Sequence, residues 1–598
     1  MKHKLCLLIT VIGVVALTLS ACGPTPTEEP TPTEEPTDPT DPTATAVPTD
    51  TPTPIPQEPS VFRYGGWWTQ PPTFNGNRFA PGGWSGAGRM YWEPLFYYMP
   101  TTGERFPLLA ESVEVTDDAY TLHLRENVVW HDGTPFTSQD VWCSITMRAL
   151  HNAAIWNSLE AIETPDDYTV IFKWEEAPSF PDPMIAGELI AEPYHLYGEW
   201  CEQIPDAMGD EDAMTAIFDD LRTFTPELPV GTGPFQVSEV TTSEFVMDKF
   251  PDHYMADQVG FDKVIMLTGA NEVMWALMIA GEIDASHAGM TMDVHDQIMA
   301  RQPDMELATP PDWSEFAVLF NLREAPYNNL KVRQAVAYAL DRREMREVSF
   351  PFALPVETYA HGVLTSQENT WLDDGFLNEL TAYNYDTNKA EALLNEAGWS
   401  KNDEGVWQDE TGEAVAWTIK VIAQWSDWVL ACENAAAQLT DFGIPTECQL
   451  VDDAVYWPSL TAGDFELAID WYASWGGSYH PWGGFNDYAF GDRAKRSGLF
   501  DDPDLPGPDG STVNIQDLVT ELSLAEDEAA ERAIVQDLAW VMNENLPAIP
   551  YLEKALPIHH NWAEMSWPSE DEPVWAMAGG GIDRAYITMM LMGKLTPN

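Results

Sequence analysis

The sequence predicts an α/β protein, because segments that alternate like β-strands are repeatedly followed by segments with helical period. In "AYTLHLRENVVWHDGTPFTSQDVWCSITMRAL", an alternating strand leads to a turn at Asp132-Gly133 and a helix capped near Thr137 or Ser138. In "QWSDWVLACENAAAQLTDFGIPTECQLV", a helix from about Ser426 stops at Gly443 and leads into a strand. Strands that alternate with helices favour the α/β class.

Two further helices lie between these segments. "NNLKVRQAVAYALDRREM" carries one apolar stripe at helical spacing, with its basic residues outside the stripe. The stripe consists of Val332, Ala335, Val336, Ala339 and Leu340. "YDTNKAEALLNEAGW" has Asp386 as its N-cap, Leu393 and Leu394 facing inward and Gly398 as its stop.

The N-terminus predicts an exported and lipid-anchored protein. Two lysines in the first four residues precede an apolar run that ends at Leu19, which is typical of a secretory signal. The following "LSAC" resembles the lipobox of bacterial lipoproteins, in which residues 1–22 form the signal with its cleavage site and Cys22 becomes the lipidated N-terminus. Such an anchor places the chain on the outer face of the cell membrane or in the periplasm. A plain secretory signal with a chance cysteine is the alternative.

Residues 23–59 consist almost entirely of proline, threonine and acidic residues, including "PTPTEEPTPTEEPTDPTDPT". This segment has nothing apolar to bury, so we expect an extended and disordered tether. In polyproline II form, at about 3 Å per residue, it would reach roughly 100 Å. The composition therefore predicts a folded part that is held away from a membrane.

The composition of the remaining chain excludes several classes of protein. A chain of 598 residues is too long for one hydrophobic core, so we expect two or more lobes. The formal net charge of −67 repels nucleic acid and anionic lipid, which excludes nucleic-acid binding and favours a soluble monomer. Beyond the signal, no apolar run is long enough for a transmembrane helix.

Four cysteines remain in the predicted folded part, and an even number outside the cytoplasm permits two disulfides. Three pairings are possible, and buried free thiols are an alternative. We expect Cys432 to pair with Cys448, because one lies early in a helix and the other in the strand that packs back beside it. Cys143 and Cys201 would then form the second pair.

The sequence shows none of the motifs that common catalytic sites require. It contains no HExxH, GxSxG or GxxxxGK[ST] motif, and "GTGPF" at Gly231 lacks the third glycine of a dinucleotide-binding turn. "DDPDLPGPDG" lacks the spacing of an EF-hand, so a solvated turn is favoured over a calcium site. We therefore assign no catalytic residue, metal or cofactor. A secreted carbohydrate-active enzyme is the alternative from a different class.

Seven blocks of the chain resemble, in order, the family 5 extracytoplasmic solute-binding proteins of ABC importers, the oligopeptide- and dipeptide-binding type. The first block is "WEPLFYY" with "PLLAESVEVTDDAYTLHLRENVVWHDGTPFTSQDV", followed by "VGTGPFQV", "GEIDA", "FNLREAPYNNLKVRQAVAYALDRREM" and "DTNKAEALLNEAGW". The last two are "GIPTECQLVDDAVYWPSLTAGDFELAIDWYASW" and "LPAIPYLEKALPIHHN". Seven such blocks in order make the resemblance highly specific.

The resemblance implies a periplasmic-binding-protein-like fold of type II, in which two α/β lobes close on a ligand about a hinge of two chain crossings. Lobe I would span 60–315, with a family-specific subdomain at about 99–227. Lobe II would span 316–551, and residues 552–598 would return to lobe I. The implied function is the capture of an oligomeric solute and its delivery to ABC permease subunits.

The stretch "WYASWGGSYHPWGGF" departs from the pattern of the peptide-binding relatives. In those proteins the corresponding segment continues as "ADYPDP", and its first aspartate pairs with the α-ammonium group of the peptide. Here Ser474 fills that position, and the stretch contains six aromatic rings and no acidic residue. Because an unpaired ammonium group is costly to bury, the usual anchor of a free peptide N-terminus is lost unless another acid replaces it.

Aromatic rings on loops replace the missing acid, and flat rings with neutral hydrogen-bonding groups suit the faces of sugars. The sequence therefore favours a neutral oligosaccharide as ligand, with an oligopeptide as the main alternative and a metal chelate as a further one. Most of the 25 tryptophans would still serve core packing. The candidate ligand-binding residues are Trp67, Trp68, Phe74, Asn75, Trp84, Trp425, Trp428, Trp471, Ser474, Trp475, Tyr479, His480 and Trp482.

Overall fold

The computed structural model describes residues 58–66, 74–81, 86–116, 118–151, 154–476, 478–508, 510–579 and 581–598. The predicted signal, Cys22 and almost all of the predicted tether lie outside these residues, as do Trp67, Trp68 and Trp84. Strands and helices alternate along the described chain, which confirms the predicted α/β class. No helix in the described ranges is long and apolar enough to cross a membrane.

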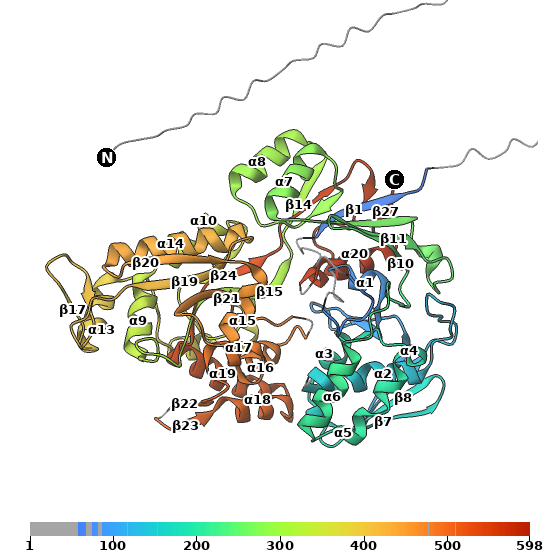
Figure 1. Cartoon of the computed structure of the whole chain (residues 1–598), viewed down its shortest axis with the longest axis horizontal. Helices are drawn as coiled ribbons and strands as arrows, with labels where there is room; N and C mark the ends of the chain where they lie inside the picture. Colours follow the sequence, from blue (N-terminus) through green and yellow to red (C-terminus); the bar gives the residue numbers. More distant parts are fainter. Residues whose placement is uncertain are drawn as a thin grey trace, which may run out of the picture. The chain divides into compact units, whose positions relative to one another are not determined.

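The first lobe is built on a seven-stranded sheet that combines segments from both ends of the chain (Figure 1). Its order is β10 (Phe235–Val240), β11 (Glu244–Lys249), β12 (Lys263–Thr268), β1 (Val61–Gly66), β13 (Ala285–Ser286), β25 (Ile558–Asn561) and β14 (Met305–Ala308). Strand β1 runs parallel to both β12 and β13, so the carboxyl ends of these three strands meet at one edge. The helices α7 (Asn271–Ala280), α8 (Met292–Arg301) and α20 (Ile582–Leu591) complete this lobe.

The second lobe is built on a six-stranded sheet with the order β16 (Leu354–Pro355), β24 (Ala548–Ala555), β15 (Pro311–Phe320), β21 (Leu467–Trp471), β19 (Trp417–Ile422) and β20 (Thr446–Val451). Strand β19 runs parallel to β20 and β21, whereas β15 runs antiparallel to its neighbours β21 and β24. The helix α14 (Ser426–Phe442) packs on β19 and β20 and against α10 (Arg342–Ser349). The helices α9 (Leu330–Ala339) and α13 (Thr387–Glu396) pack against each other.

Two segments connect the two sheets, and they lie side by side. The chain leaves β14 for β15 at residues 309–310 and returns from β24 to β25 at residues 556–557. The backbone N–H of Leu556 donates to the carbonyl of Pro310 over 2.8 Å, so the two segments are bonded to each other. The expected lobe boundaries at 315/316 and 551/552 fall within β15 and β24, a few residues from these connections.

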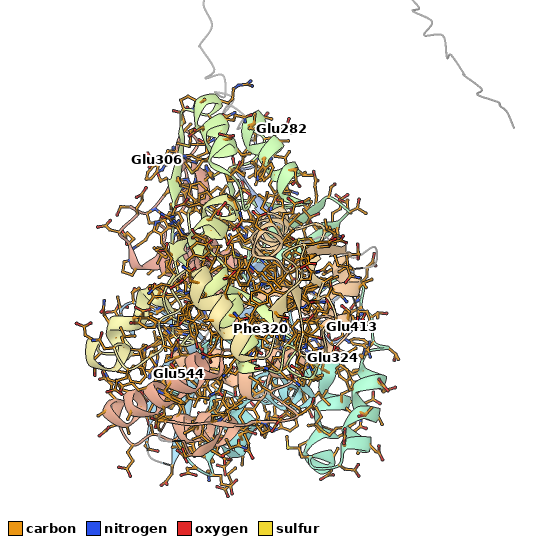
Figure 2. The ribbon with its side chains drawn as sticks, turned by 90° about the vertical axis from the view of Figure 1, so that its left-hand side faces the viewer. Glu282, Glu306, Phe320, Glu324, Glu413 and Glu544 are labelled. Atoms are coloured by element: carbon orange, nitrogen blue, oxygen red, sulfur yellow. A yellow bond between two sulfur atoms is a disulfide. The ribbon has the colours of Figure 1, made fainter. Side chains whose placement is uncertain are left out.

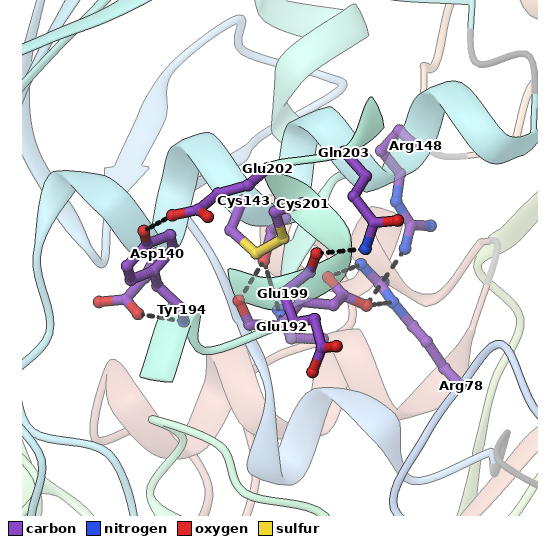
Figure 3. The surroundings of a disulfide bond; sticks show 12 residues. Arg78, Asp140, Cys143, Arg148, Glu192, Tyr194, Glu199, Cys201, Glu202 and Gln203 are labelled. Atoms are coloured by element: carbon purple, nitrogen blue, oxygen red, sulfur yellow. Dashed lines mark hydrogen bonds and ion pairs between the residues drawn. A yellow bond between two sulfur atoms is a disulfide. The ribbon is translucent and has the colours of Figure 1, made fainter. Parts of the chain in front are cut away.

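A four-stranded antiparallel sheet forms the core of a subdomain within the first lobe. Its order is β5 (Ala110–Val115), β6 (Ala119–Leu124), β8 (Thr169–Trp174) and β7 (Leu159–Asp166). A disulfide joins Cys143 in α2 (Ser138–Met147) to Cys201 in α4 (Tyr194–Cys201), with 5.3 Å between their Cα atoms (Figure 3). Beside it, buried Glu192 binds Arg78 and accepts a hydrogen bond from Arg148 over 3.4 Å. The bond and the ion pairs together fix α2 against the chain that follows it.

The second disulfide joins Cys432 in α14 to Cys448 in β20, with 6.0 Å between their Cα atoms. The structure therefore contains both cysteine pairs expected from the sequence. Because the bond closes a loop with a sequence separation of 16, it stabilises this part of the second lobe by about 3 kcal/mol in the chain-entropy account.

The predicted helix limits follow from their capping residues. Thr137 forms a capping box with Asp140, and the carboxylate of Asp386 accepts hydrogen bonds from the backbone of Asn388 and Lys389. Helix α14 ends at Phe442, and Gly443 adopts a φ of 105°, which a residue with a Cβ rarely adopts. Each of these helices therefore begins or ends where the sequence predicts.

The segment after Asn329 forms two helices, α9 and α10, and the prediction that its basic residues lie away from the packed face is wrong for one arginine of each. Arg333 and Arg342 are both buried, and each guanidinium donates to several backbone carbonyls. Burial lowers the pKa of both side chains to about 10, so they remain charged at neutral pH. An arginine can be buried in this way because its planar fork satisfies several acceptors at once.

The acidic residues are spread over the surface of the described chain. Figure 2 labels Glu282, Glu306 and Glu413, which are all exposed, whereas Phe320 is fully buried in the second lobe. The charges of these three glutamates lie in solvent, whereas other acids, such as Glu192 and Asp470, are buried.

Candidate functional site: a cleft at the strand ends of two sheets

Two neighbouring cavities lie at the carboxyl ends of the parallel strands of both sheets. From the first lobe, β1 ends at Gly66, β12 is followed by Asn271, and β13 is followed by His287. From the second lobe, β19 is followed by Trp425 and β21 ends at Trp471. Ligands of open α/β sheets bind outside the carboxyl ends of the strands, so this is the expected place for a site.

The first of these, which we name the tryptophan cavity, has a volume of about 410 Å³. Its aromatic lining consists of Phe316, Phe350, Trp425, Trp428, Trp457 and Trp471. Its polar lining includes Asn271, His287, Gln424, Asp427, Arg496 and Lys554. Both lobes contribute residues, so a molecule in this cavity would touch both.

The four tryptophans of this cavity form one continuous wall. The rings of Trp457 and Trp471 are stacked, with 5.6 Å between their centroids and 18° between their planes. Trp425 and Trp428 meet edge to face at 4.7 Å, and Trp428 meets Trp471 in the same way at 5.0 Å. Because the rings pack on one another, they leave no room for a ligand between them. The ligand would instead lie along one face of the wall.

The second, which we name the ion-pair cavity, has a volume of about 210 Å³. It shares His287, Trp471 and Lys554 with the tryptophan cavity, so the two are adjacent parts of one cleft. Two ion pairs line it: Arg89 binds Asp583 over 3.1 Å, and Lys554 binds Asp312 over 3.4 Å.

The cleft carries charge, although the stretch from Trp471 to Phe485 has none. Burial raises the pKa of the Asp427 carboxyl, and the nearby positive charge of Lys554 partly offsets this rise. Burial, with a smaller effect from Lys554, lowers the pKa of His287 to about 3, so its imidazole is neutral at pH 7. The prediction of a site without charge therefore holds for the loop and not for the walls supplied by other elements.

Four of the predicted ligand-binding residues line the cleft. Trp425, Trp428 and Trp471 line the tryptophan cavity, and Ser474 and Trp471 line the ion-pair cavity. Trp425, Trp471 and Ser474 lie at or within three residues of the end of a parallel strand, whereas Trp428 lies in α14, is 1% exposed and supports the wall from within the second lobe. Trp67, Trp68 and Trp84 lie outside the described residues.

The later rings of the stretch pack inside the protein, which corrects the prediction that they face the ligand. The side chain of Trp475 is 2% exposed and stacks on Trp313 with 6.3 Å between their centroids. Tyr479 packs on the same Trp313 and hydrogen-bonds to Arg584. The backbone at Gly476 still lines the ion-pair cavity, but the rings of Trp475 and Tyr479 pack on Trp313 instead of lining it.

His480 and Trp482 likewise contact protein instead of the cleft. The imidazole of His480 stacks on Phe180 of the first lobe at 4.1 Å and accepts a hydrogen bond from the backbone of Trp482 through Nδ1. Trp482 also meets Phe180, at 5.6 Å. Both residues therefore belong to a contact between the lobes, which lies apart from the two cavities.

Phe74 packs against strand β11, and Asn75 forms hydrogen bonds within its own loop. Phe74 meets Phe245 edge to face at 4.8 Å. The amide of Asn75 donates to the carbonyl of Pro81, and its oxygen accepts from the backbone of Asn77. Neither residue lines either cavity.

Sequence reasoning missed several residues that line the cleft, among them Trp457, Asp427, His287, Lys554 and Arg89. Trp457 could have been found, because it follows β20 at the same edge where Trp428 follows β19. The charged residues offered no comparable signal, because they come from distant segments that only the fold brings together.

Comparison with known proteins identifies the family. The sequence profile of the bacterial extracellular solute-binding proteins, family 5, matches residues 104–496. A protein of Brucella ovis named as an ABC transporter peptide-binding protein is 27% identical over 324 residues, which is 52% of this chain and 55% of the relative. The glutathione-binding protein GsiB of Salmonella typhimurium is 26% identical over 303 residues, which is 49% of this chain and 53% of the relative. The chain thus spans about half the length of the curated relatives it matches.

Two solved structures share the fold over nearly the whole chain. A periplasmic oligopeptide-binding protein of Thermotoga maritima with bound mannohexaose has a TM-score of 0.71 and 21% identity, and the match covers 91% of this chain and 99% of that protein. The oligopeptide-binding protein AppA of Bacillus subtilis with a nonapeptide has a TM-score of 0.69 and 16% identity, with 90% and 100% covered. At these identities the likeness establishes the fold, a periplasmic-binding-protein fold of type II with two lobes.

Proposed function

The chain belongs to the bacterial extracellular solute-binding proteins of family 5, and we propose that it is the receptor of an ABC importer. In this proposal the protein captures an oligomeric solute between its lobes, outside the cytoplasm, and delivers it as a monomer to the permease subunits. It binds its ligand without changing it. The main observation behind this proposal is the cleft, which is lined by residues of both lobes. It lies beside two connecting segments that can act as a hinge.

The proposed ligand is a neutral oligosaccharide. The tryptophan wall supports this choice, because stacked indole rings offer a flat apolar surface to the face of a sugar ring. Ser474, which stands where the peptide-binding relatives carry an acid, lines the adjoining cavity and supplies a neutral hydrogen-bonding group. The mannohexaose in the Thermotoga maritima relative is consistent with an oligosaccharide in this fold.

An oligopeptide is the second candidate, and one observation favours it. The carboxyl group of Asp427 lines the tryptophan cavity and is an acid close to Trp425 and Trp428. It could therefore replace the missing acid and hold an α-ammonium group. The curated relatives named as peptide- and glutathione-binding proteins point the same way.

Calorimetry separates the two candidates. Wild-type protein is titrated with cello-oligosaccharides and with a mixed pool of short peptides, alongside the variant Ser474→Asp. We expect the sugar to bind wild type and the restored acid to give it no advantage, because the sugar carries no charge to meet. Tight peptide binding by wild type without sugar binding would reject the oligosaccharide. Shortening of the oligosaccharides during incubation would reveal an enzyme instead.

We also propose that the lipid on Cys22 anchors the protein to the outer face of the membrane and that residues 23–59 act as its tether. The observation behind this proposal is the "LSAC" motif after an apolar segment. The variant Cys22→Ala should leave the membrane fraction or accumulate as an uncleaved precursor. A variant that stays lipid-labelled and membrane-bound would show that this cysteine is not the anchor.

A further inference from the structure

A short helix beneath the tryptophan cavity binds the end of strand β21. Helix α17 (Asp492–Ser497) carries Arg496, whose guanidinium donates to both carboxylate oxygens of Asp470, over 3.2 and 3.0 Å. Asp470 is fully buried, and one of its oxygens also accepts the backbone N–H of Trp471 over 2.8 Å. A carboxylate without access to water needs such a partner, so Arg496 and Asp470 fix the backbone from which Trp471 projects.

The same guanidinium also touches the tryptophan wall directly. It lies over the ring of Trp457 at 4.6 Å from the centroid, and Trp457 is in turn stacked on Trp471. The indole nitrogen of Trp457 donates to Asp453 over 2.9 Å, which fixes the rotation of the ring in its own plane. One arginine side chain thus acts on both members of the stacked pair: it contacts the ring of Trp457 directly and reaches the backbone of Trp471 through the carboxylate of Asp470.

We infer that Arg496 is the positioning residue that holds Trp457 against Trp471 and so keeps this surface of the tryptophan wall in place for the ligand. This inference rests on the proposed function and explains how that surface is kept in place before the ligand arrives. A large side chain that is already fixed loses little conformational entropy when the ligand binds, so the net binding free energy is more favourable. Arginine suits this role because its planar, permanently charged group can pair with a carboxylate and stack on an indole together.

A neighbouring arginine on the same helix shows what is particular to Arg496. Arg493 donates from Nε to the carbonyl of Trp471 over 2.9 Å and pairs with Asp487. Among the described residues, no aromatic ring lies beneath its guanidinium at cation–π distance. Arg493 binds the backbone of Trp471 directly and Arg496 does so through Asp470, but only Arg496 also contacts the ring of Trp457.

The test replaces Arg496 by lysine, which keeps the charge for Asp470 and removes the planar face. We expect Arg496→Lys to raise the Kd for cello-oligosaccharides about tenfold while the melting temperature stays near that of wild type. The near-ultraviolet circular dichroism of the stacked indoles, assigned by subtracting the spectrum of Trp457→Phe, should weaken in the same variant. The control Lys495→Gln removes a positive charge from an exposed position of the same helix and should change neither quantity.

The circular dichroism needs no ligand, so it separates this inference from the proposed function. If wild type binds peptides and no sugar, the proposed function fails, and the dichroism still decides whether Arg496 holds the rings. If Arg496→Lys keeps both the wild-type dichroism and the wild-type affinity, the inference is overturned. Should Arg496→Lys not fold, the double variant Asp470→Asn/Arg496→Met removes the ion pair as a unit, and the same two losses are expected from it.

Discussion

Two groups of aromatic side chains stand at the same edge of the six-stranded sheet, and their surroundings differ. Trp425, Trp428, Trp457 and Trp471 wall the tryptophan cavity, whereas Trp475, Tyr479, His480 and Trp482 pack against protein. The first group lies at the end of a parallel strand or in the segment that follows one. The second follows a stretch in which Gly476 and Tyr479 both adopt a positive φ, of 51° and 52°. The path of the chain after the strand end, and not aromatic composition, therefore decides which rings line the cavity.

The largest expected effect concerns the packed group. Trp475→Ala should lower the free energy of unfolding by about 3–5 kcal/mol, because it leaves a large cavity against Trp313. Denaturant unfolding measures this, with Trp471→Ala as the matched tryptophan at the cleft. If Trp475→Ala proves as stable as wild type but loses ligand affinity, its ring belongs with the cavity group.

The next effect concerns the cavity group. Trp471→Ala should weaken oligosaccharide binding by about 1–3 kcal/mol, because it removes the ring that lines both cavities. Calorimetric titration checks this, and the unfolding free energy should fall less than in Trp475→Ala. Unchanged affinity in Trp471→Ala would mean that the ligand does not use the wall.

The packed group also joins the two lobes through Phe180. This residue precedes α3 (Pro181–Ala186) of the first lobe, yet it stacks on His480 and belongs to the hydrophobic core of the second lobe. Closed lobes should therefore be stabilised by this contact, and Phe180→Ala should weaken ligand binding by about 1 kcal/mol without touching the ligand.

Small-angle scattering provides the readout for this contact. Saturating ligand should reduce the radius of gyration of wild type, and ligand-free Phe180→Ala should be larger than ligand-free wild type. Equal radii for the two ligand-free proteins, together with equal affinities, would show that Phe180 does not contribute to closure.

The smallest expected effect is a pH dependence in the packed group. Burial lowers the pKa of His480 from its usual 6.5, with a weaker opposing effect from Glu531 at 3.8 Å. Between the pKa of His480 in the folded protein and its higher pKa in the unfolded chain, the unfolded chain binds more protons. The free energy of unfolding therefore decreases as the pH falls below about 6.5. Unfolding of wild type and His480→Gln at pH 7 and pH 5 should show a smaller loss in the variant. Identical losses would assign the pH dependence to other groups.

The sequence predicted local structure well where one residue decides it. Caps such as Thr137 and Asp386 and the stop at Gly443 depend on neighbouring backbone groups, which the sequence displays directly. The four predicted residues that line the cleft come from segments at or after the ends of parallel strands, which a local reading can also locate. By contrast, Arg89, Lys554 and Asp583 reach the cleft from segments far apart in the chain. The packing of Trp475 on Trp313 likewise depends on tertiary structure that no short motif reveals.

The central claim is that the tryptophan wall receives an oligosaccharide, and the natural ligand tests it most directly. The protein is purified from the cells that produce it, without added ligand, and its bound molecules are identified by native mass spectrometry and fragmentation. The account predicts adducts whose masses differ by single sugar residues and which are reduced in Trp471→Ala. Bound peptides, retained equally by wild type and Trp471→Ala, would contradict it.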